Sequence, residues 1–374
     1  MEAKISEISE NNGLYKFTLS NLNVSIANAL RRTIMSEIPC VVFRTETFET
    51  NQCTFIKNTT RQHNEILKQR LSCIPVHMSY KDINVLPDKY MLEVHVKNDS
   101  DEVKFVTTED FKIKNKMTPD KEIDATEIKK IFPPDPLTNE YIDFARLRPK
   151  ISNSIPGEEI HLTCEFSISN AKENSMFNVV SKCAYGNSVD LEKVNIEWEK
   201  YEAQLRSQEL SKQEIEFHKK NFYILDAQRH FKENSFDFVL RSVGFYENKE
   251  IPKIACKILI DKFKKLGELL ESKSINIFAS EVAMEYSYDI TLYDEDYTVG
   301  KVLEYLLYQK YFDTTNKADK LLSFCGFQKK HPHDDFSIIR IAFINISDKA
   351  MVESCLKNAI DSSEIIFKGL YNIL

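Results

Sequence analysis

The sequence lacks several features that would place it in a specialised class of protein. It has no apolar run of the roughly 18 residues that a membrane helix needs, and its N-terminus, MEAKISEISENNG, is too polar and acidic for a secretory signal. Its net charge is −7 and its pI is near 5.8, so overall charge does not direct it to nucleic acid. Hydrophobic residues make up 42% of its 374 residues, which is enough for the cores of two or three domains.

Clustered cysteines are also missing. None of the eight forms a CxxC pair, and in a long chain without an export signal such spacing indicates reduced thiols in the core. We therefore expect no metal site and no cofactor. The cysteines are Cys40, Cys53, Cys73, Cys164, Cys183, Cys256, Cys325 and Cys355.

Three short segments carry residues typical of catalytic or metal sites, and each favours a simpler interpretation. Gly300-Lys301 resembles the end of a phosphate-binding loop, but that loop needs glycine at 295 and serine or threonine at 302. Residues 294–296, DED, could offer oxygen ligands to a divalent cation, yet an acidic loop before a helix explains them better. Residues 331–335, HPHDD, contain ligand-type side chains, but a loop before a strand is favoured over a metal site.

Hydrophobic periodicity predicts elements at both ends of the chain. Residues 14–22 alternate as a half-buried strand, and a helix with Ser25 as its N-cap should follow and end before Pro39. A strand is expected over 41–50. Further helices are predicted over 249–272, capped by Asn248, and from about residue 348 onwards.

The middle of the chain has a different pattern. From about 46 to 229, short alternating segments are joined by polar loops, and the pattern of residues 112–140 predicts an irregular, proline-containing loop. Residues 192–221 are rich in charge and helical in composition, which predicts a solvated helix.

The two ends of the chain contain an internal repeat. VSIANALRRTIM at 24–35 aligns with YTVGKVLEYLLY at 297–308, with Ser25 over Thr298 as a second predicted N-cap. The apolar positions match, whereas Arg31 and Arg32 stand over glutamate and tyrosine. The repeat predicts two copies of one unit that form an intramolecular pseudo-dimer, the first copy being split by a large insertion.

Several of these segments resemble the alpha-type subunits of multisubunit RNA polymerases: bacterial alpha, archaeal D and the eukaryotic third subunit. NVSIANALRRTIMSEIPC at 23–40 is similar to their first signature, and NEILKQRLSCIPVH at 64–77 to their second. Residues 147–186 resemble part of the insertion domain in archaeal and eukaryotic members. Residues 293–309 and 326–341 resemble the partner of these proteins, archaeal L or the eukaryotic eleventh subunit.

The resemblance covers most of the chain and implies a fusion, because the two subunits are normally separate proteins. Such a fusion suggests a large DNA virus of eukaryotes. The fold class implied is α+β, with two alpha-like dimerisation units and a mainly β insertion domain. The predicted divisions are 1–45 and 230–276 for the first unit, 46–229 for the insertion domain, and 277–374 for the second unit.

The resemblance also implies function. The alpha-type dimer is the assembly platform for the second-largest and largest catalytic subunits, beside small accessory subunits, so we expect a non-catalytic scaffold for DNA-directed transcription. It would act inside the cell, in the nucleus, a viral factory or a virion, without membrane contact or sequence-specific DNA binding. The alternative is a free-standing regulator or decoy that binds polymerase subunits.

Site residues carried over from the family fall into two groups. Arginine presents a planar fork that suits carboxylates and backbone carbonyls at interfaces, although two arginines could also merely solvate a helix end. The residues expected to dock the second-largest subunit are Arg31, Arg32, Arg70, Ile74 and Pro75, of which the last three could equally form a buried turn. The residues expected at the joint between the two units are Ile26, Ala29, Leu30, Val299, Val302 and Leu303.

Overall fold

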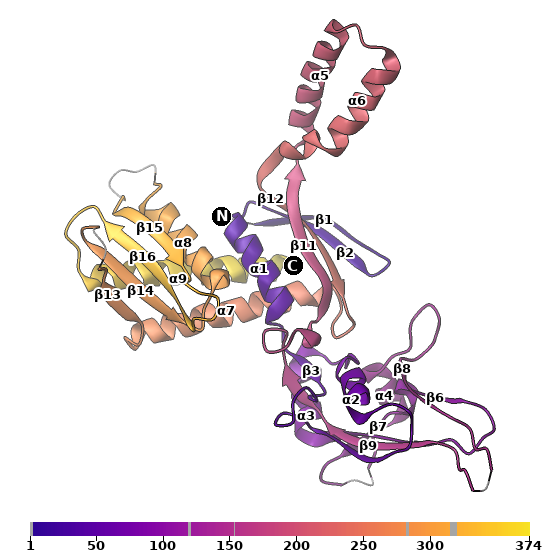
Figure 1. Cartoon of the computed structure of the whole chain (residues 1–374). Helices are drawn as coiled ribbons and strands as arrows, with labels where there is room; N and C mark the ends of the chain where they lie inside the picture. Colours follow the sequence, from indigo (N-terminus) through magenta and orange to yellow (C-terminus); the bar gives the residue numbers. More distant parts are fainter. Residues whose placement is uncertain (1–2, 119–120, 153, 282–283, 315–319) are drawn as a thin grey trace. The chain divides into compact units, whose positions relative to one another are not determined.

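The computed structural model describes residues 3–118, 121–152, 154–281, 284–314 and 320–374 (Figure 1). The chain forms two compact units. The first contains Met1–Thr33, Lys182–Leu240 and Ala255–Leu374, and the second contains Ile34–Ser181 and Arg241–Ile254. Both combine helices with sheets, which confirms the predicted mixture of the two.

The first unit holds two four-stranded antiparallel sheets. Its strands are β1 (Lys4–Asn11), β2 (Leu14–Ser20), β11 (Val180–Val189), β12 (Phe231–Ser242), β13 (Asn276–Ala279), β14 (Ser287–Tyr293), β15 (Leu322–Gln328) and β16 (Phe336–Phe343). Its helices are α1 (Val24–Ser36), α5 (Leu191–Ser207), α6 (Lys212–Ile224), α7 (Glu250–Glu271), α8 (Tyr297–Tyr311) and α9 (Lys349–Ile373). A few terminal residues of α1, β11, β12 and α7 belong to the second unit.

The two sheets have the same topology. We call β1, β2, α1, β11, β12 and α7 the N-terminal half, and β13 to β16 with α8 and α9 the C-terminal half. Each half runs strand, strand, helix, strand, strand, long helix. The spatial order is β1-β2-β12-β11 in one sheet and β13-β14-β16-β15 in the other, so each order is first, second, fourth, third.

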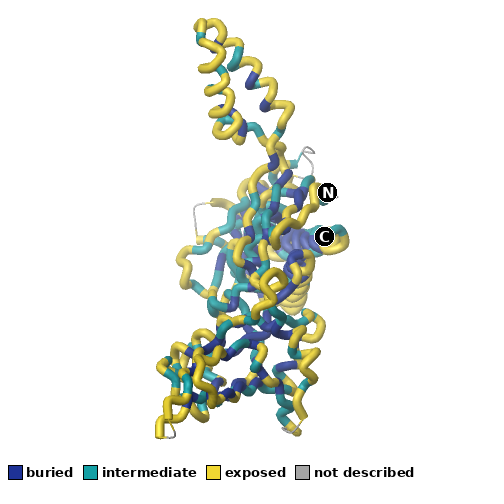
Figure 2. The backbone as a smooth tube through the Cα atoms, turned by 90° about the vertical axis from the view of Figure 1, so that its right-hand side faces the viewer, coloured by how far each residue is buried: buried dark blue, intermediate teal, exposed yellow. Residues whose placement is uncertain are grey.

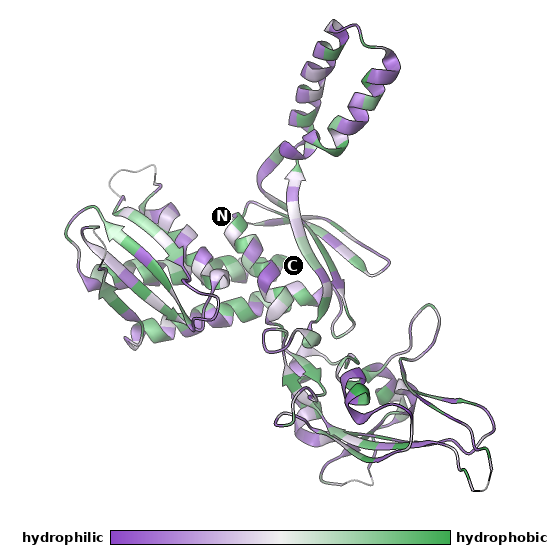
Figure 3. Cartoon of the chain, in the orientation of Figure 1, coloured by the Kyte–Doolittle hydropathy of each residue, from purple (hydrophilic) through white to green (hydrophobic). Residues whose placement is uncertain are grey.

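Alternation along the central strands builds the core of each half. Phe17 on β2 pairs with Phe238 on β12, and their rings stack at 5.0 Å. In the C-terminal half the alternate residues Ile339 and Ile341 of β16 are buried, and α8 packs on β15 and β16. Figure 3 shows hydrophobic residues along these strands. Apolar residues at a period of two thus decide which face of each sheet is buried.

The charged region near 192–221 is a helical hairpin, not one solvated helix. Helix α5 ends at Ser207 and α6 begins at Lys212, with Ser211 and Glu214 forming a reciprocal capping box at the new start. The S-x-x-E pattern was present in the sequence and could have predicted the break. Figure 2 shows that most of the hairpin is exposed, while Trp198 and Phe222 are buried between its helices.

The second unit is built mainly from short strands. They are β3 (Cys40–Val42), β4 (Cys53–Asn58), β5 (Tyr90–Lys97), β6 (Lys104–Thr107), β7 (Lys112–Asn115), β8 (Asp143–Leu147), β9 (Glu159–Glu165) and β10 (Ser167–Ser169). Its helices are α2 (Asn64–Ser72), α3 (Val85–Lys89) and α4 (Ala125–Ile131). The largest sheet has the order β4-β9-β5-β7, and β6-β8 and β3-β10 form separate pairs.

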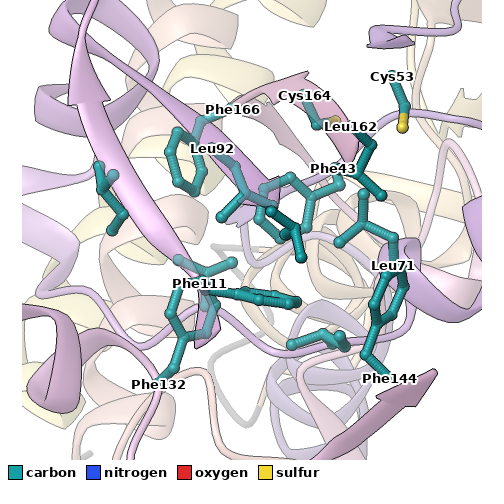
Figure 4. Close-up of a cluster of buried hydrophobic side chains, with 14 of the residues drawn as sticks. Phe43, Cys53, Leu71, Leu92, Phe111, Phe132, Phe144, Leu162, Cys164 and Phe166 are labelled. Carbon is teal, nitrogen blue, oxygen red and sulfur yellow. The ribbon is translucent and has the colours of Figure 1, made fainter. Parts of the chain in front are cut away.

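Phenylalanine rings pack with aliphatic side chains in the core of the second unit (Figure 4). The Phe111 ring makes T-shaped contacts with the rings of Phe132 and Phe144, at centroid distances of 5.3 and 5.7 Å. Cys53 on β4 pairs directly with Cys164 on β9, and both are free thiols. Hydrogen bonding to Cys164 lowers the pKa of Cys53.

Two other sequence-based expectations need correction in this unit. The strand expected over 41–50 is confined to β3, because its partner β10 offers only three residues for pairing. The irregular segment 112–140 contains β7 and α4 as well as turns. Pro119, which lies in that segment, falls outside the described residues.

The second unit overlaps the insertion domain predicted over 46–229 but differs in extent. It begins at Ile34, ends its long segment at Ser181, and also includes Arg241–Ile254. The hairpin of α5 and α6 groups with the first unit. The predicted domain boundaries therefore stay a prediction. Among the described residues, no helix has both the length and the apolar composition to cross a bilayer.

Candidate functional site

Helix α1 carries the two arginines singled out in the sequence. It begins two residues earlier than expected: Asn23 Oδ1 accepts a hydrogen bond of 2.8 Å from the Ser25 amide, so the side chain of Asn23, not Ser25, caps the helix. Its apolar stripe is buried, and the two arginines lie half-buried at its edge. The stripe consists of Ile26, Ala27, Ala29, Leu30 and Ile34.

Arg32 reaches from α1 to the start of α8. Its Nη2 donates to Asp296 Oδ2 at 2.7 Å, and its Nε donates to Thr298 Oγ1 at 3.0 Å. Asp296 is the N-cap of α8 and accepts from the Thr298 amide at 2.8 Å, so Thr298 is not the cap that the repeat predicted. The contact links residues 264 positions apart, which no local pattern could have shown.

The acidic loop 294–296 is confirmed as a loop before a helix. Two cations of the N-terminal half form ion pairs with it. Besides Arg32, Lys262 on α7 donates to Glu295 Oε2 at 3.2 Å, and both side chains are 18% exposed. Burial acts to raise the pKa of Asp296, but hydrogen bonds from Thr298 and the charge of Arg32 outweigh it, so the pKa lies below its ordinary value.

Helices α7 and α9 supply a second set of contacts between the halves. The rings of Phe263 and Phe367 stack at 5.7 Å, and both are fully buried. Lys357 Nζ donates to Glu271 Oε1 at 2.8 Å at the exposed end of this contact. Sequence reasoning missed all of these residues. Their helical periodicity indicated buried faces, but not which helix each face would meet.

The six residues expected at the joint are all buried to within 1% exposure. Burial of this kind fits both the core of each half and a joint between halves, so the assignment stays a prediction. Gly300 has a separate explanation: a Cβ there would lie 2.0 Å from Cε2 of the Phe327 ring on β15. This glycine permits close packing of a helix on a strand, as expected for a buried helix interior.

Arg31 has different neighbours from Arg32. Its Nε donates to Asn28 Oδ1 at 3.1 Å, and its two terminal nitrogens have no acceptor in the part of the chain that the structure describes. Burial raises the pKa of Cys183 and of Tyr185 on β11, and the nearby charge of Arg31 opposes both shifts. Arg31 thus lies beside β11 with unused donors.

The remaining docking candidates belong to the second unit. Arg70, near the end of α2, donates through Nε to the Phe144 carbonyl at 2.8 Å and through Nη2 to the Asp143 carbonyl at 2.5 Å. Ile74 is 4% exposed within the core, and Pro75 is half-buried. Arg70 is therefore the member of this group that presents polar atoms at the surface.

The ion pair between Arg32 and Asp296 should contribute measurably to stability. We expect Arg32→Ala and Asp296→Asn each to lower the free energy of unfolding of the first unit by about 1 kcal/mol. A double-mutant cycle should give a coupling of similar size. Asparagine also caps helices, so Asp296→Asn removes the charge and keeps the cap. Urea unfolding at neutral pH measures all three variants.

The pH dependence gives an independent check of the same pair. Because the folded pKa of Asp296 is depressed, its contribution is present above the ordinary value of 3.8 and is lost as the pH falls below 3.8 through the folded value. The wild type and Asp296→Asn should therefore converge in stability at acidic pH. Arg206→Ala, which breaks an exposed pair with Glu202, is the control with little expected effect. Additive effects of the two variants at neutral pH would contradict the coupling.

Comparison with known proteins assigns the chain to a family. The family described as RNA polymerase Rpb3/Rpb11 dimerisation domain matches residues 16–263, about two thirds of the chain. The chain belongs to this family. The matched residues run from Lys16 on β2 to Phe263 on α7, so they contain most of the N-terminal half and all of the second unit.

Two relatives that are named as polymerase subunits agree with the family match, and a third has a different name. The chain is 41% identical over 61 residues to DNA-directed RNA polymerase subunit Rpo3 of Thermococcus kodakarensis, covering 16% of this chain and 21% of that protein. It is 38% identical over 76 residues to Rpo3 of Pyrococcus furiosus, covering 20% and 26%. It is 27% identical over 176 residues to a conjugation stage-specific protein of Tetrahymena thermophila, covering 44% and 53%. The chain thus spans about a fifth to a half of the length of the curated relatives it matches.

Proposed function

We propose that this member of the Rpb3/Rpb11 family is a non-catalytic scaffold subunit of a multisubunit DNA-directed RNA polymerase. The observation that carries the proposal is the repeated topology. The family of the Rpb3/Rpb11 dimerisation domain matches most of the N-terminal half, and the C-terminal half repeats the strand order of the N-terminal half within the same chain. We infer that the two halves form an intramolecular pseudo-dimer, as fused relatives of two normally separate subunits would.

The contacts between the halves support this arrangement. An ion pair to the α8 cap, a second pair at Glu295 and one stacked aromatic pair connect them. Covalent linkage replaces a bimolecular association by an intramolecular one at high effective concentration. Contacts of this kind can therefore suffice to hold the two halves together. The scaffold would then act at the site of transcription inside the cell.

We propose that Arg31 and Arg70 dock the second-largest catalytic subunit, and that Arg32 chiefly holds the joint. Arg31 has unused donors at the surface, whereas Arg32 is committed to Asp296 and Thr298. A half-buried arginine fork with free N–H groups suits a carboxylate or backbone carbonyl of a partner. The largest subunit and small accessory subunits would assemble on this first complex.

Co-expression with the second-largest subunit of the same genome tests the proposal. We expect the wild-type chain to capture that subunit in a pull-down, and Arg31→Ala to weaken capture about thirtyfold, the effect of removing a hot-spot side chain worth about 2 kcal/mol. Arg206→Ala, an exposed arginine of the hairpin, is the matched control and should capture normally.

Each outcome of the pull-down has a separate meaning. Capture by the wild type and equal capture by Arg31→Ala would overturn the docking site and leave the scaffold in place. No capture by the wild type would overturn the scaffold itself. In that case, binding to a polymerase subunit of a different genome would indicate the regulator or decoy.

A further inference from the structure

Four arginines line one cavity of about 360 Å³ in the second unit. They come from three separate segments: the loop before α2, the end of α2, and β8 with the residue that follows it. The arginines are Arg61, Arg70, Arg146 and Arg148. The acidic side chains in the lining are Asp143 and Glu158 alone, so cations outnumber acids there in a chain whose net charge is −7.

The arginines differ in how far their donors are used. Arg148 pairs with Glu158, which is 6% exposed, at 2.5 Å. Arg146 pairs with Asp143 through Oδ2 at 3.2 Å. Arg61 makes no hydrogen bond or ion pair with any described residue. The cavity therefore holds one uncommitted guanidinium and others with donors to spare, since each guanidinium carries five N–H groups.

Two acceptors in the same lining lack donors. Gln62 Oε1 and Asp143 Oδ1 are both buried, and neither has a hydrogen-bond partner among the described residues. A buried acceptor without a donor costs free energy that a bound N–H group would recover. The cavity is therefore suited to a ligand that carries both negative charge and N–H donors.

We propose that this cavity binds an acidic segment of a partner polypeptide. Carboxylates of the segment would pair with Arg61 and Arg146, and its main-chain amides would donate to Gln62 and Asp143. A nucleic-acid backbone fits less well, because phosphodiesters offer no N–H donors to the two unpaired acceptors. Phe105 is 51% exposed, and the Arg146 guanidinium lies 4.9 Å from its ring centroid, which adds an apolar surface for an aromatic or aliphatic neighbour.

This inference goes beyond the scaffold role, because it concerns the chemistry of the segment and holds whichever protein supplies it. The two proposals are also tested by different readouts. Capture of the second-largest subunit reports on Arg31, whereas binding of a short peptide to the isolated chain reports on the cavity.

Fluorescence anisotropy of the full chain with a labelled peptide of repeated Asp-Glu-Phe units tests the inference. We expect saturable binding at physiological salt, and about tenfold weaker binding by the double variant Arg61→Ala/Arg146→Ala, which removes two charge-assisted contacts. The same peptide with methylated main-chain nitrogens keeps its charge but lacks donors, and should also bind about tenfold more weakly. Arg206→Ala is again the control, because it also removes arginine charge, and it should bind as the wild type does.

Three results would overturn the inference. Equal binding by the wild type and the double variant would show that the cavity is not the site. Equal binding of the methylated peptide would show that charge alone drives association. Tighter binding of an oligouridylate of equal charge, lost in the double variant, would identify the cavity as a nucleic-acid site instead.

Discussion

Replacing Gly157 by alanine is expected to destabilise the second unit by about 3 kcal/mol, at the upper end of the usual cost of overpacking. A Cβ at this position would lie 1.7 Å from the main-chain oxygen of Asn98. That oxygen cannot move away without disturbing the hydrogen bonds that hold Asn98. The Asn98 amide donates to the Glu158 carbonyl at 2.9 Å, and its side chain donates to main-chain carbonyls of Glu102 and Leu147.

Hydrogen exchange, followed by mass spectrometry, can assign the loss to the second unit. Peptides from β5 and β9 should lose protection in Gly157→Ala, whereas those from α9 should keep it. Gly186→Ala is the matched control, because a Cβ there would meet nothing within 4 Å. Its stability should be unchanged or slightly raised, since alanine costs less backbone entropy than glycine. Normal protection in Gly157→Ala would show that the loop at 157 can shift.

Trp198→Ala should unfold the hairpin of α5 and α6 while the two sheets stay folded. Trp198 is 5% exposed, and its ring lies 5.4 Å from that of Phe222 across the hairpin. Removing a buried tryptophan costs about 3–5 kcal/mol. Helices of this length are marginal by themselves in water, so the hairpin depends on its small core. We expect exchange protection to disappear from 191–224 and to persist in β14 and β16.

Phe217 provides the control for this variant on the same hairpin. It is also aromatic but 63% exposed, so Phe217→Ala should change the stability little. Because Trp198 is the only tryptophan in the sequence, tryptophan fluorescence of the wild type should report on the hairpin alone. A fluorescence transition that coincides with loss of the sheets would show that the hairpin does not unfold independently.

The hairpin shows why a charge-dense segment is hard to interpret from its sequence. Its buried residues are few and are spread over two helices, so charge dominates its composition. Figure 3 shows hydrophobic and hydrophilic residues alternating along both helices. The local capping signal at Ser211 was present, but the pairing of Trp198 with Phe222 depends on the turn between the helices.

The sequence by itself determined the helices α1, α7, α8 and α9, because apolar residues at helical spacing favour one buried face whatever lies opposite. It also determined the internal repeat and the family, since both depend on the order of residue types along the chain. It did not determine which donors find which acceptors.

Only the tertiary structure decided that Arg32 meets Asp296, that Cys53 lies opposite Cys164, and that four arginines share a cavity with two unpaired acceptors. These contacts join segments tens to hundreds of residues apart. A charged or polar side chain carries no periodic signal for its partner, because its energy depends on geometry that the folded backbone creates. Arg31 and Arg32 are neighbours in the sequence. In the fold Arg32 binds Asp296 and Thr298, whereas Arg31 keeps unused donors.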